Sequence, residues 1–368
     1  MGEVLDDMYN GQTPSRNKSE YWNGNIKWLS SGELNRGTVY DSIEMITEDG
    51  QKSANLRIVP KGTFIMAITG LEAAGTRGNC ALLGFDTTLN QSCMALFPKK
   101  DLLTSDFLFQ WYRKVGEEYG LNYTQGTKQQ SYNAELIKIL PISLPLVTEQ
   151  KKIASYLSNI DHLITLHQRK LEKLQLVKKS MLEKMFPKNG SKIPEIRFEG
   201  FADDWEQRKL GEVTQKFKSG NSLKADKISE SGAYPVYGGN GLRGYTSTYN
   251  HEGEFALIGR QGALCGNMNY FIGKAYFTEH AVAVEADENN NTRFMYYMLD
   301  TMNLGQYSDQ SAQPGLAVNK LIKLENMFPK KEEQIKIENY FQSIDHLITL
   351  HQRKLEKLQL VKKSMLEK

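Results

Sequence analysis

Apolar residues recur with a 4-3-4-3 spacing in two long stretches of this chain. In the first stretch the repeating positions are held by Ile160, Ile164, His167, Leu171, Leu174, Lys178, Met181 and Met185, and the stripe is widened by Leu163, Leu166 and Val177. This spacing predicts a helix with a coiled-coil seam that is imperfect at His167 and Lys178. Thr148 is a suitable N-cap and Pro187 stops the helix, so residues 148–186 would span about 58 Å at about 1.5 Å per residue.

The second stretch repeats the first. Residues 344–368 are identical to residues 160–184, and the offset of 184 is half of the 368 residues. The chain is therefore expected to be two half-molecules, each with a head and a copy of the same helix. The predicted parts are a first head at 1–147, a helix at 148–186, a linker at 187–201, a second head at 202–330 and a helix at 331–368.

Each predicted helix exposes an apolar stripe that needs a partner, and its own twin is the nearest candidate. We expect antiparallel pairing about a pseudo-twofold axis, because the linker is long enough for the chain to cross over. The polar seam positions His167 and Lys178 are candidate contacts for a partner subunit.

The heads have the pattern of mixed α/β domains. Short strands are predicted at 25–29, 63–68, 93–97, 254–258 and 281–284, and helices at 107–115 and 294–303. The order of elements matches between the heads, with 65–70 aligned to 255–260 and 90–92 to 278–280. The predicted fold class is α+β, with two mixed α/β heads joined by two long helices packed as a pseudo-twofold antiparallel coiled coil.

Composition is that of a soluble globular protein. No apolar run approaches the roughly 18 residues that cross a bilayer, and the N-terminus lacks a signal peptide, so a cytoplasmic location without membrane contact is expected. Cys80, Cys93 and Cys265 are widely spaced and are predicted to be core residues. The net charge is +3, and each 25-residue repeat carries +3, so the rest of the chain sums to 3 − 6 = −3. Phosphate contacts by the heads would have to come from local clusters.

Enzyme motifs are mostly missing from the sequence. The run 239–244 fits G-x-G-x-x-G, but the β-rich segment after it cannot open the helix that would hold a pyrophosphate, so a glycine-rich surface loop is favoured over a nucleotide site. His162 and His167 and their copies His346 and His351 lack the i, i+4 spacing of a helical metal pair and are interpreted as solvated or seam-facing. We predict no catalytic residues, no metal and no cofactor bound by this chain.

Polar loops laced with aromatic residues occur at corresponding places in both heads. Arg, Gln and Asn side chains can pair bidentately with base edges, and Lys suits phosphates, although such composition is also ordinary for solvated loops. The candidate DNA-binding residues of the first head are Gln12, Arg16, Lys18, Arg77, Asn79, Gln91, Lys128, Gln129 and Tyr132. Those of the second head are Asn221, Lys224, Tyr237, Asn240, Arg243, Arg260, Gln261, His280 and Gln313.

A family resemblance rests on the helices and the linker. Its signatures are Glu149-Gln150-Lys151-Lys152-Ile153-Ala154, Ile160-Asp161-x-x-Ile164, the repeated helix, Met185-Phe186-Pro187 and Phe198-x-Gly200-Phe201-x-x-x-Trp205-Glu206-Gln207-Arg208-Lys209-Leu210-Gly211. In this arrangement, which covers the whole chain, the sequence resembles the specificity subunit of type I restriction-modification systems. The resemblance implies two target-recognition domains that each read half of a split, asymmetric site in double-stranded DNA, with the helices as a ruler between them.

The resemblance also implies partners. Two methyltransferase subunits would dock on the chain, bind S-adenosylmethionine and methylate an adenine in each half-site, and a restriction subunit is a further potential partner. The chief alternative is a non-DNA scaffold whose duplicated helices assemble a complex and whose heads bind proteins.

The two heads differ in how they begin. The run 205–210 that introduces the second head has no counterpart before Gly2-Glu3-Val4. A trimmed chain or an early natural start would each produce this, and the opening strand of the first head is expected to be less well anchored.

Overall fold

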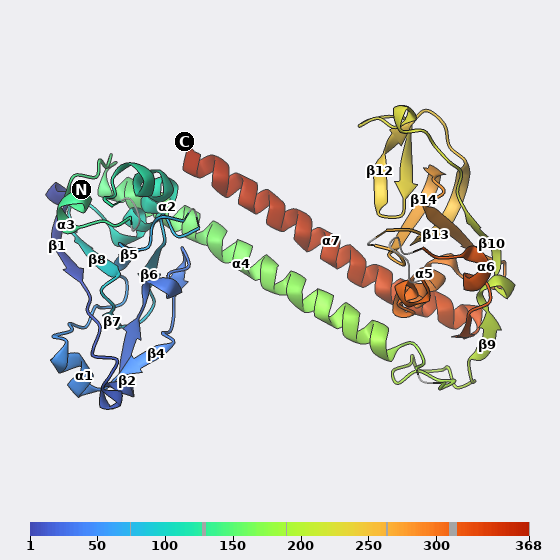
Figure 1. The fold of residues 1–368 in the computed structure, drawn as a ribbon, viewed down its shortest axis with the longest axis horizontal. Helices are drawn as coiled ribbons and strands as arrows, with labels where there is room; N and C mark the ends of the chain where they lie inside the picture. The colour runs from blue at the N-terminus through green and yellow to red at the C-terminus, as the bar shows by residue number, and fades with distance from the viewer. Residues whose placement is uncertain (74, 127–129, 189, 263, 309–314, 368) are drawn as a thin grey trace. The chain divides into compact units, whose positions relative to one another are not determined.

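The computed structural model describes residues 1–368 except 74, 127–129, 189, 263, 309–314 and 368 (Figure 1). The chain divides into two compact units. Unit 1 comprises Met1–Leu166 with Leu355–Lys368, and unit 2 comprises His167–Lys354. Each unit therefore contains one head together with parts of both long helices.

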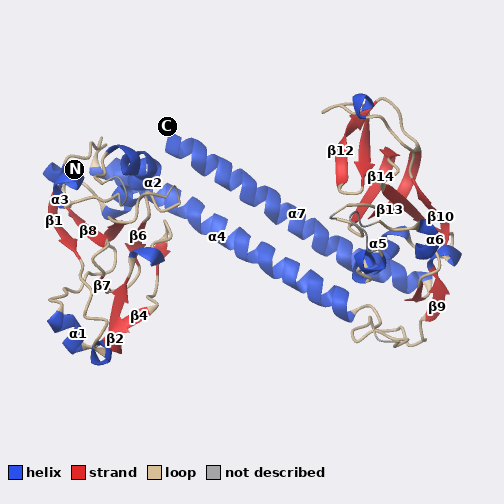
Figure 2. Cartoon of the chain, viewed as in Figure 1, coloured by secondary structure: helices blue, strands red, loops and turns tan. Residues whose placement is uncertain are grey.

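The head of unit 1 is built on a five-stranded sheet with α2 packed on it (Figure 2). The sheet order is β1 (Leu5–Asn10), β8 (Cys93–Pro98), β5 (Phe64–Ala67), β6 (Cys80–Leu83) and β3 (Thr38–Val39). The helices are α2 (Ser105–Asn122) and the short α3 (Ala134–Lys138), with 3-10 turns at Gly2–Val4, Ser19–Tyr21 and Ser31–Glu33. Cys80 and Cys93 are buried in this core, as predicted, and burial raises the pKa of the Cys80 thiol to about 12.

A separate three-stranded sheet belongs to the first head alone among the described residues. It contains β4 (Glu44–Ile46), β2 (Trp22–Leu29) and β7 (Thr88–Leu89), with α1 (Glu48–Ser53) beside it. Trp28, Ile46 and Leu56 form its separate apolar core. This small lobe holds the loop that follows β1.

The head of unit 2 has a six-stranded sheet with α5 against it. Its order is β10 (Thr214–Ser219), β15 (Ala281–Ala286), β13 (His251–Gly259), β14 (Met268–Phe277), β11 (Tyr234–Gly238) and β12 (Gly241–Thr246). The remaining elements are β9 (Glu206–Lys209) paired with β16 (Glu325–Phe328), α5 (Thr292–Thr301), α6 (Val318–Leu321) and 3-10 turns at Leu210–Glu212, Ala225–Lys227 and Leu304–Tyr307. The glycine-rich run 239–244 forms the turn and second strand of the β11–β12 hairpin, so no helix follows it, as predicted.

The two heads share one core topology. β1 pairs antiparallel with β8, which also pairs with β5, and β10 pairs antiparallel with β15, which also pairs with β13. Both β1 and β10 have a register shift after their first residue. Ala67 pairs with Cys93 in the first head and Gly259 pairs with Ala281 in the second, so Cys93 is equivalent to Ala281 and Ala67 to Gly259. The predicted alignment of 90–92 with 278–280 is confirmed, whereas that of 65–70 with 255–260 was wrong by two residues. Both strands are apolar and buried at consecutive positions, and a shift of two residues keeps every side chain on the same face of the sheet.

The opening strand of the first head is as well paired as its counterpart. β1 makes the same ladder with β8 that β10 makes with β15. The Met1 ammonium donates to the Leu140 carbonyl oxygen at 2.7 Å, in the position where the Leu210 backbone N–H donates to Leu324. The predicted weaker anchoring of this strand was therefore wrong.

The long helices are α4 (Val147–Lys184) and α7 (Lys331–Glu367). Each is fixed at its start by a buried glutamine. Gln150 accepts from the Thr104 N–H and donates to the Leu102 and Pro145 carbonyl oxygens. Gln334 accepts from the Asn291 N–H and donates to the Pro329 carbonyl oxygen in the same way. Because Thr104 and Asn291 are the N-caps of α2 and α5, each glutamine joins a head to a long helix.

The first long helix ends two residues earlier than predicted. Met185 and Phe186 lie outside α4 and are buried, and the Phe186 ring lies 6.1 Å from Phe341 and 5.6 Å from Phe294. The apolar core of the second head therefore draws these residues out of the helix. The sequence pattern included Met185 in the seam because an apolar residue suits either a helix seam or the core of a head.

Within unit 2, α4 and α7 are antiparallel. Lys178 pairs with Asp345 at 2.6 Å, and His167 contacts His351, so the numbering falls along one helix as it rises along the other. Within unit 1, Asp161 pairs with Lys362, which is the same ion pair at the repeated positions. The predicted antiparallel pairing is confirmed, but His167 and Lys178 contact the partner helix and are not free polar positions for another subunit.

The predicted width of the seam needs one correction. Leu163 and Leu166 are 41% exposed instead of packed in the stripe, and their copies Leu347 and Leu350 are 41% and 38% exposed. Two helices bury only a narrow stripe each, so residues beside the seam remain on the surface. No helix in the described part of the chain is long and apolar enough to cross a membrane.

Candidate nucleic-acid interface

The loop after the first strand takes the same backbone path in both heads. The Gly11 N–H donates to Cys93 O at 3.3 Å, and the Gly220 N–H donates to Ala281 O at 3.0 Å. The next residues are Gln12 and Asn221, whose N–H groups donate to Leu89 O and Phe277 O, both at 3.0 Å. These two predicted site residues are thus equivalent, and both are exposed.

Glycine is required where this loop crosses the neighbouring chain. A Cβ atom at Gly11 would lie 2.1 Å from Leu89 O, and one at Gly220 would lie 2.0 Å from Phe277 O. These atoms belong to the backbone and cannot turn away, so a side chain at either position would displace the loop.

The other predicted loops lie at the same edge of each sheet. The Ile68 N–H donates to Ser92 O in the first head, and the Arg260 N–H donates to His280 O in the second, both at 2.9 Å. In the first head the end of β5 therefore contacts the loop that precedes β8, beside the loop after β1. In the second head the end of β13 contacts the loop that precedes β15, beside the loop after β10. In the second head the β11–β12 turn joins them, because the Thr278 N–H donates to Tyr237 O at 2.9 Å. Each head thus gathers its separate polar segments at one edge.

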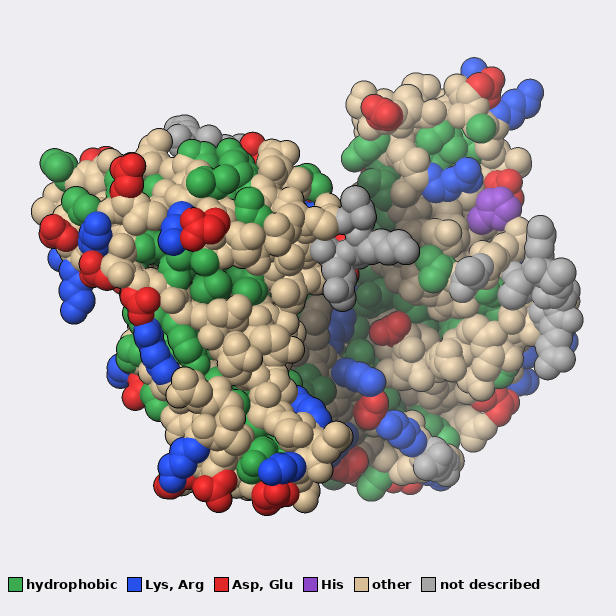
Figure 3. Space-filling model, turned by 60° about the vertical axis from the view of Figure 1, so that its left-hand side comes forward, with side chains coloured by type: hydrophobic (Ala, Val, Ile, Leu, Met, Phe, Trp, Pro, Cys, Tyr) green, Lys and Arg blue, Asp and Glu red, His purple; other side chains and the backbone are tan. Residues whose placement is uncertain are grey.

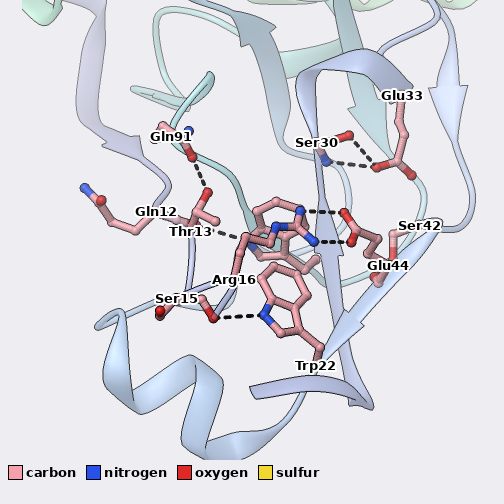
Figure 4. A network of polar contacts seen from close by, with 11 residues as sticks. Gln12, Thr13, Ser15, Arg16, Trp22, Ser30, Glu33, Ser42, Glu44 and Gln91 are labelled. Atoms are coloured by element: carbon pink, nitrogen blue, oxygen red, sulfur yellow. Dashed lines mark hydrogen bonds and ion pairs between the residues drawn. The ribbon is translucent and has the colours of Figure 1, made fainter. Parts of the chain in front are cut away.

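In the first head an arginine fixes the loop after β1 (Figure 4). The Arg16 guanidinium lies 3.7 Å from the Trp22 ring centroid and pairs in a fork with Glu44, with Nη2 2.8 Å from Oε2. Both tryptophans of the small lobe hold the loop backbone, since Trp22 Nε1 donates to Ser15 O at 3.1 Å and Trp28 Nε1 donates to Gln12 O at 3.0 Å. The Glu44 hydrogen bond raises the pKa of Arg16, and the reciprocal bond lowers the pKa of Glu44.

This geometry changes the role predicted for Arg16. Its fork is occupied by Glu44 and its face by Trp22, so it does not present a free guanidinium to a base edge. Arg16 holds the loop after β1 against the small lobe instead. Figure 4 also shows Gln91 accepting a hydrogen bond from Thr13 Oγ1, which ties the loop before β8 to the same structure.

The remaining first-head candidates differ in accessibility. Lys18 is exposed and its Nζ lies 3.0 Å from the Tyr21 hydroxyl. Arg77 is half-buried and donates to Glu72 O at 2.7 Å, and the Asn79 side chain accepts from Arg36. Tyr132 is buried in the core and burial raises its pKa to about 12, so its prediction as a DNA-contacting residue was wrong: its ring fills apolar space. Lys128 and Gln129 lie outside the described residues.

The second head also presents exposed polar side chains at this edge. The exposed predicted residues are Asn221, Lys224, Asn240, Arg243 and Gln261. Arg260 is half-buried with Nε donating to Leu316 O at 3.2 Å, and His280 lies 3.6 Å from Glu279. Tyr237 is half-buried and packs on Phe271, with ring centroids 5.1 Å apart, so it supports the hairpin more than it faces solvent. Gln313 lies outside the described residues.

Charge at the surface is mixed. On the face turned to the viewer in Figure 3, Lys and Arg side chains alternate with Asp and Glu. This agrees with the sequence expectation that the heads carry no bulk basic field. Among the described residues no group of three or more His, Cys, Asp or Glu side chains is placed to hold a metal ion.

Residues 1–176 and 202–360 match the family described as the type I restriction modification DNA specificity domain. The chain belongs to the type I restriction-modification specificity family. It is 32% identical over 354 residues to the EcoprrI specificity subunit of Escherichia coli, across 93% of this chain and 86% of that relative. It is 24% identical to the MjaVIII specificity subunit of Methanocaldococcus jannaschii, across 97% of this chain and 88% of that one.

The fold of this specificity-family chain also matches a solved structure. The type I restriction-modification S subunit from M. genitalium superposes with a TM-score of 0.71 at 19% identity, across 99% of this chain and 93% of that one. At this identity the likeness shows the fold alone.

Two residues important to the site of this specificity-family chain escaped sequence reasoning. Glu44 and Trp28 lie 28 and 12 residues from Arg16 and belong to other strands of the small lobe. Nothing local in the sequence marks either as its neighbour. Trp22 is close to Arg16 in the sequence, but only the folded lobe shows that Arg16 lies on its ring.

Proposed function

We propose that this chain recognises DNA sequence within a type I restriction-modification complex, with each head reading one half of a bipartite, asymmetric site. The chain would carry no catalytic step and bind no cofactor itself. Methylation with S-adenosylmethionine would be performed by two methyltransferase subunits, and cleavage by a restriction subunit where one is present. These activities belong to a cytoplasmic complex.

One observation carries the proposal. Both heads place exposed polar side chains, such as Gln12 and Asn221, on equivalent backbone at the same edge of the same sheet, and other equivalent positions of that edge differ in chemistry, as Gln91 and Glu279 do. A shared scaffold with different side chains at the same positions is what reading two different half-sites needs. The long helices share an identical run of 25 residues whereas the heads differ in sequence, so we assign the helices to spacing and docking.

The exposed leucines support docking of two identical partners. Unit 1 exposes Leu163, Leu166 and Leu360 on its helices, and unit 2 exposes the repeat counterparts Leu347, Leu350 and Leu176. Each unit therefore offers one copy of the same apolar surface. This replaces His167 and Lys178 as the surface proposed for the methyltransferase subunits.

The experiment is a binding and methylation assay of the chain with its methyltransferase partners. Replacing residues 202–330 by the second head of another family member should change one half-site of the methylated sequence and leave the other unchanged. Adding one helical turn to a long helix should change the spacer and preserve both half-sites. Binding that is absent, or that does not weaken with salt, would favour the protein-binding scaffold instead.

A further inference from the structure

In the second head the loop that precedes β15 carries a carboxylate with few hydrogen-bond partners. The Glu279 side chain is 39% exposed. Ser222 Oγ lies 3.4 Å from Glu279 Oε1, which is longer than an ordinary hydrogen bond between oxygens, and His280 Nε2 lies 3.6 Å from the same oxygen. The other oxygen, Oε2, is shielded from solvent and has no hydrogen-bond partner among the described residues. The protein therefore leaves Glu279 able to accept a further hydrogen bond.

Glu279 lies where the polar loops of the second head meet. The residue before it donates its backbone N–H to Tyr237 O in the β11–β12 hairpin, at 2.9 Å. The carbonyl oxygen of the residue after it accepts from the Arg260 N–H at the end of β13, also at 2.9 Å. Its carboxylate lies beside Ser222, in the loop after β10. DNA bound against these loops would therefore meet the carboxylate.

The first head has an amide at the equivalent position. Because Cys93 is equivalent to Ala281, counting back two residues in each head makes Gln91 the counterpart of Glu279. A glutamine side chain both donates and accepts hydrogen bonds, whereas an ionised carboxylate only accepts them. The same backbone position thus offers different hydrogen-bonding chemistry in the two heads, as a residue that distinguishes two half-sites must.

An ionised carboxylate is restricted in what it can contact on DNA. It repels phosphates, and it cannot pair with guanine O6 and N7 or with thymine O4, because these atoms also accept hydrogen bonds. The amino donors of the major groove are cytosine N4 and adenine N6. Adenine places its N7 acceptor beside N6, where it would face the second carboxylate oxygen. Cytosine is therefore the base whose major-groove edge suits Glu279 best.

We propose that Glu279 is a specificity-determining residue of the second head and accepts a hydrogen bond from the N4 amino group of a cytosine in its half-site. This inference rests on the proposed function in DNA recognition and adds the base that one side chain reads. The long contacts with Ser222 and His280 hold the carboxylate at the edge of the sheet without satisfying it. The cytosine amino group supplies the missing donor.

The test uses the full chain with its methyltransferase partners and measures methylation of DNA duplexes that differ at single positions of the half-sites. For the unmodified chain we expect one position at which cytosine is preferred over the other bases by about 5- to 150-fold. Glu279→Ala should remove the preference at that position alone. Glu279→Gln should shift it from cytosine toward adenine, because an amide pairs with adenine N6 and N7. Selectivity is the readout because removal of a carboxylate also weakens repulsion of the phosphates.

The matched control is Glu288→Gln, which removes the same charge from an exposed residue beyond the other end of β15 and should leave every position unchanged. If the unmodified chain methylates a specific site and both Glu279 variants select it equally well, this inference alone is overturned. Loss of the whole half-site in both variants would make Glu279 a positioning residue and also overturn it. Methylation without any sequence preference by the unmodified chain would overturn the proposed function together with this inference.

Discussion

His167 and His351 occupy the same position in the two copies of the repeat, and their Nδ1 atoms lie 2.8 Å apart where α4 and α7 pack together. One nitrogen must donate and the other accept, so the contact requires at least one neutral ring. Burial, followed by the positive charges of His167, Lys170 and Lys354, lowers the pKa of His351. A repeated residue meeting its own copy therefore forms a contact that depends on pH.

The first prediction concerns acid stability. The folded state binds this proton less readily than the unfolded chain, whose histidines titrate near about 6.5. The contribution of the pair is therefore complete above that pH and is lost as the pH falls through the lowered pKa of His351. Thermal unfolding of the unmodified chain at pH 7.5 and 5.5 should show a lower midpoint in acid.

The matched variant for that prediction is His167→Leu with His351→Leu. It fills two seam positions with apolar side chains and should lose part of the acid sensitivity, so its advantage over the unmodified chain should grow as the pH falls. Burial and nearby Lys216 and Lys218 lower the pKa of His251 to about 4, so His251 also contributes to acid sensitivity. Because His251 is present in both proteins, its contribution cancels in the comparison. Equal pH dependence in the two proteins would contradict the role of the histidine pair.

The second prediction concerns the buried glutamines. Gln150→Leu would leave the Thr104 N–H and the carbonyl oxygens of Leu102 and Pro145 without their partner. Since each buried unpaired group costs about 1–3 kcal/mol, we expect a loss of roughly 2–4 kcal/mol in the free energy of unfolding. Urea unfolding measures it. Lys151→Leu, at the exposed next position, should change stability by less than about 0.5 kcal/mol.

The third prediction tests the loop glycines. Gly11→Ala should disturb recognition of one half-site, because its Cβ would overlap the backbone at Leu89. Mapping of methylated sites should show that half-site relaxed or lost while the other is kept. Gly75→Ala in the same head is the control, since a Cβ there meets nothing within 4 Å. Gly220→Ala should act in the same way on the other half-site only.

The fourth prediction separates positioning from reading in the first head. Arg16→Lys keeps the charge but cannot form the fork with Glu44 or cover Trp22 equally well, so it should loosen the loop. Gln12→Ala should leave the loop in place and remove a base-reading side chain, at about 1–3 kcal/mol of discrimination. Tryptophan fluorescence should change for Arg16→Lys and not for Gln12→Ala, whereas half-site selectivity should fall for both. Unchanged selectivity in Gln12→Ala would remove Gln12 from the readout.

The sequence by itself determined the duplicated plan. An exact repeat with a helical apolar period requires two equal helices, and identical stripes pair most simply with each other, so α4, α7 and their antiparallel packing were predictable. The apolar strands near 63–68 and 281–284 were also predictable, because burial on both faces of a sheet leaves a continuous apolar run in the sequence.

Only the tertiary structure decided which polar residues are available. Arg16 and Gln12 are both exposed residues of one polar loop, but only the fold shows that Glu44 and Trp22 engage the guanidinium of Arg16. Tyr132 was predicted to be an exposed aromatic loop residue, but in the fold it is buried in the core. The two-residue error in aligning β5 with β13 arose because register depends on the neighbouring strand. The apolar period of a helix or strand is local and can be recognised in a single sequence. Side-chain exposure and strand register depend on residues that are distant in the chain and meet only in the fold.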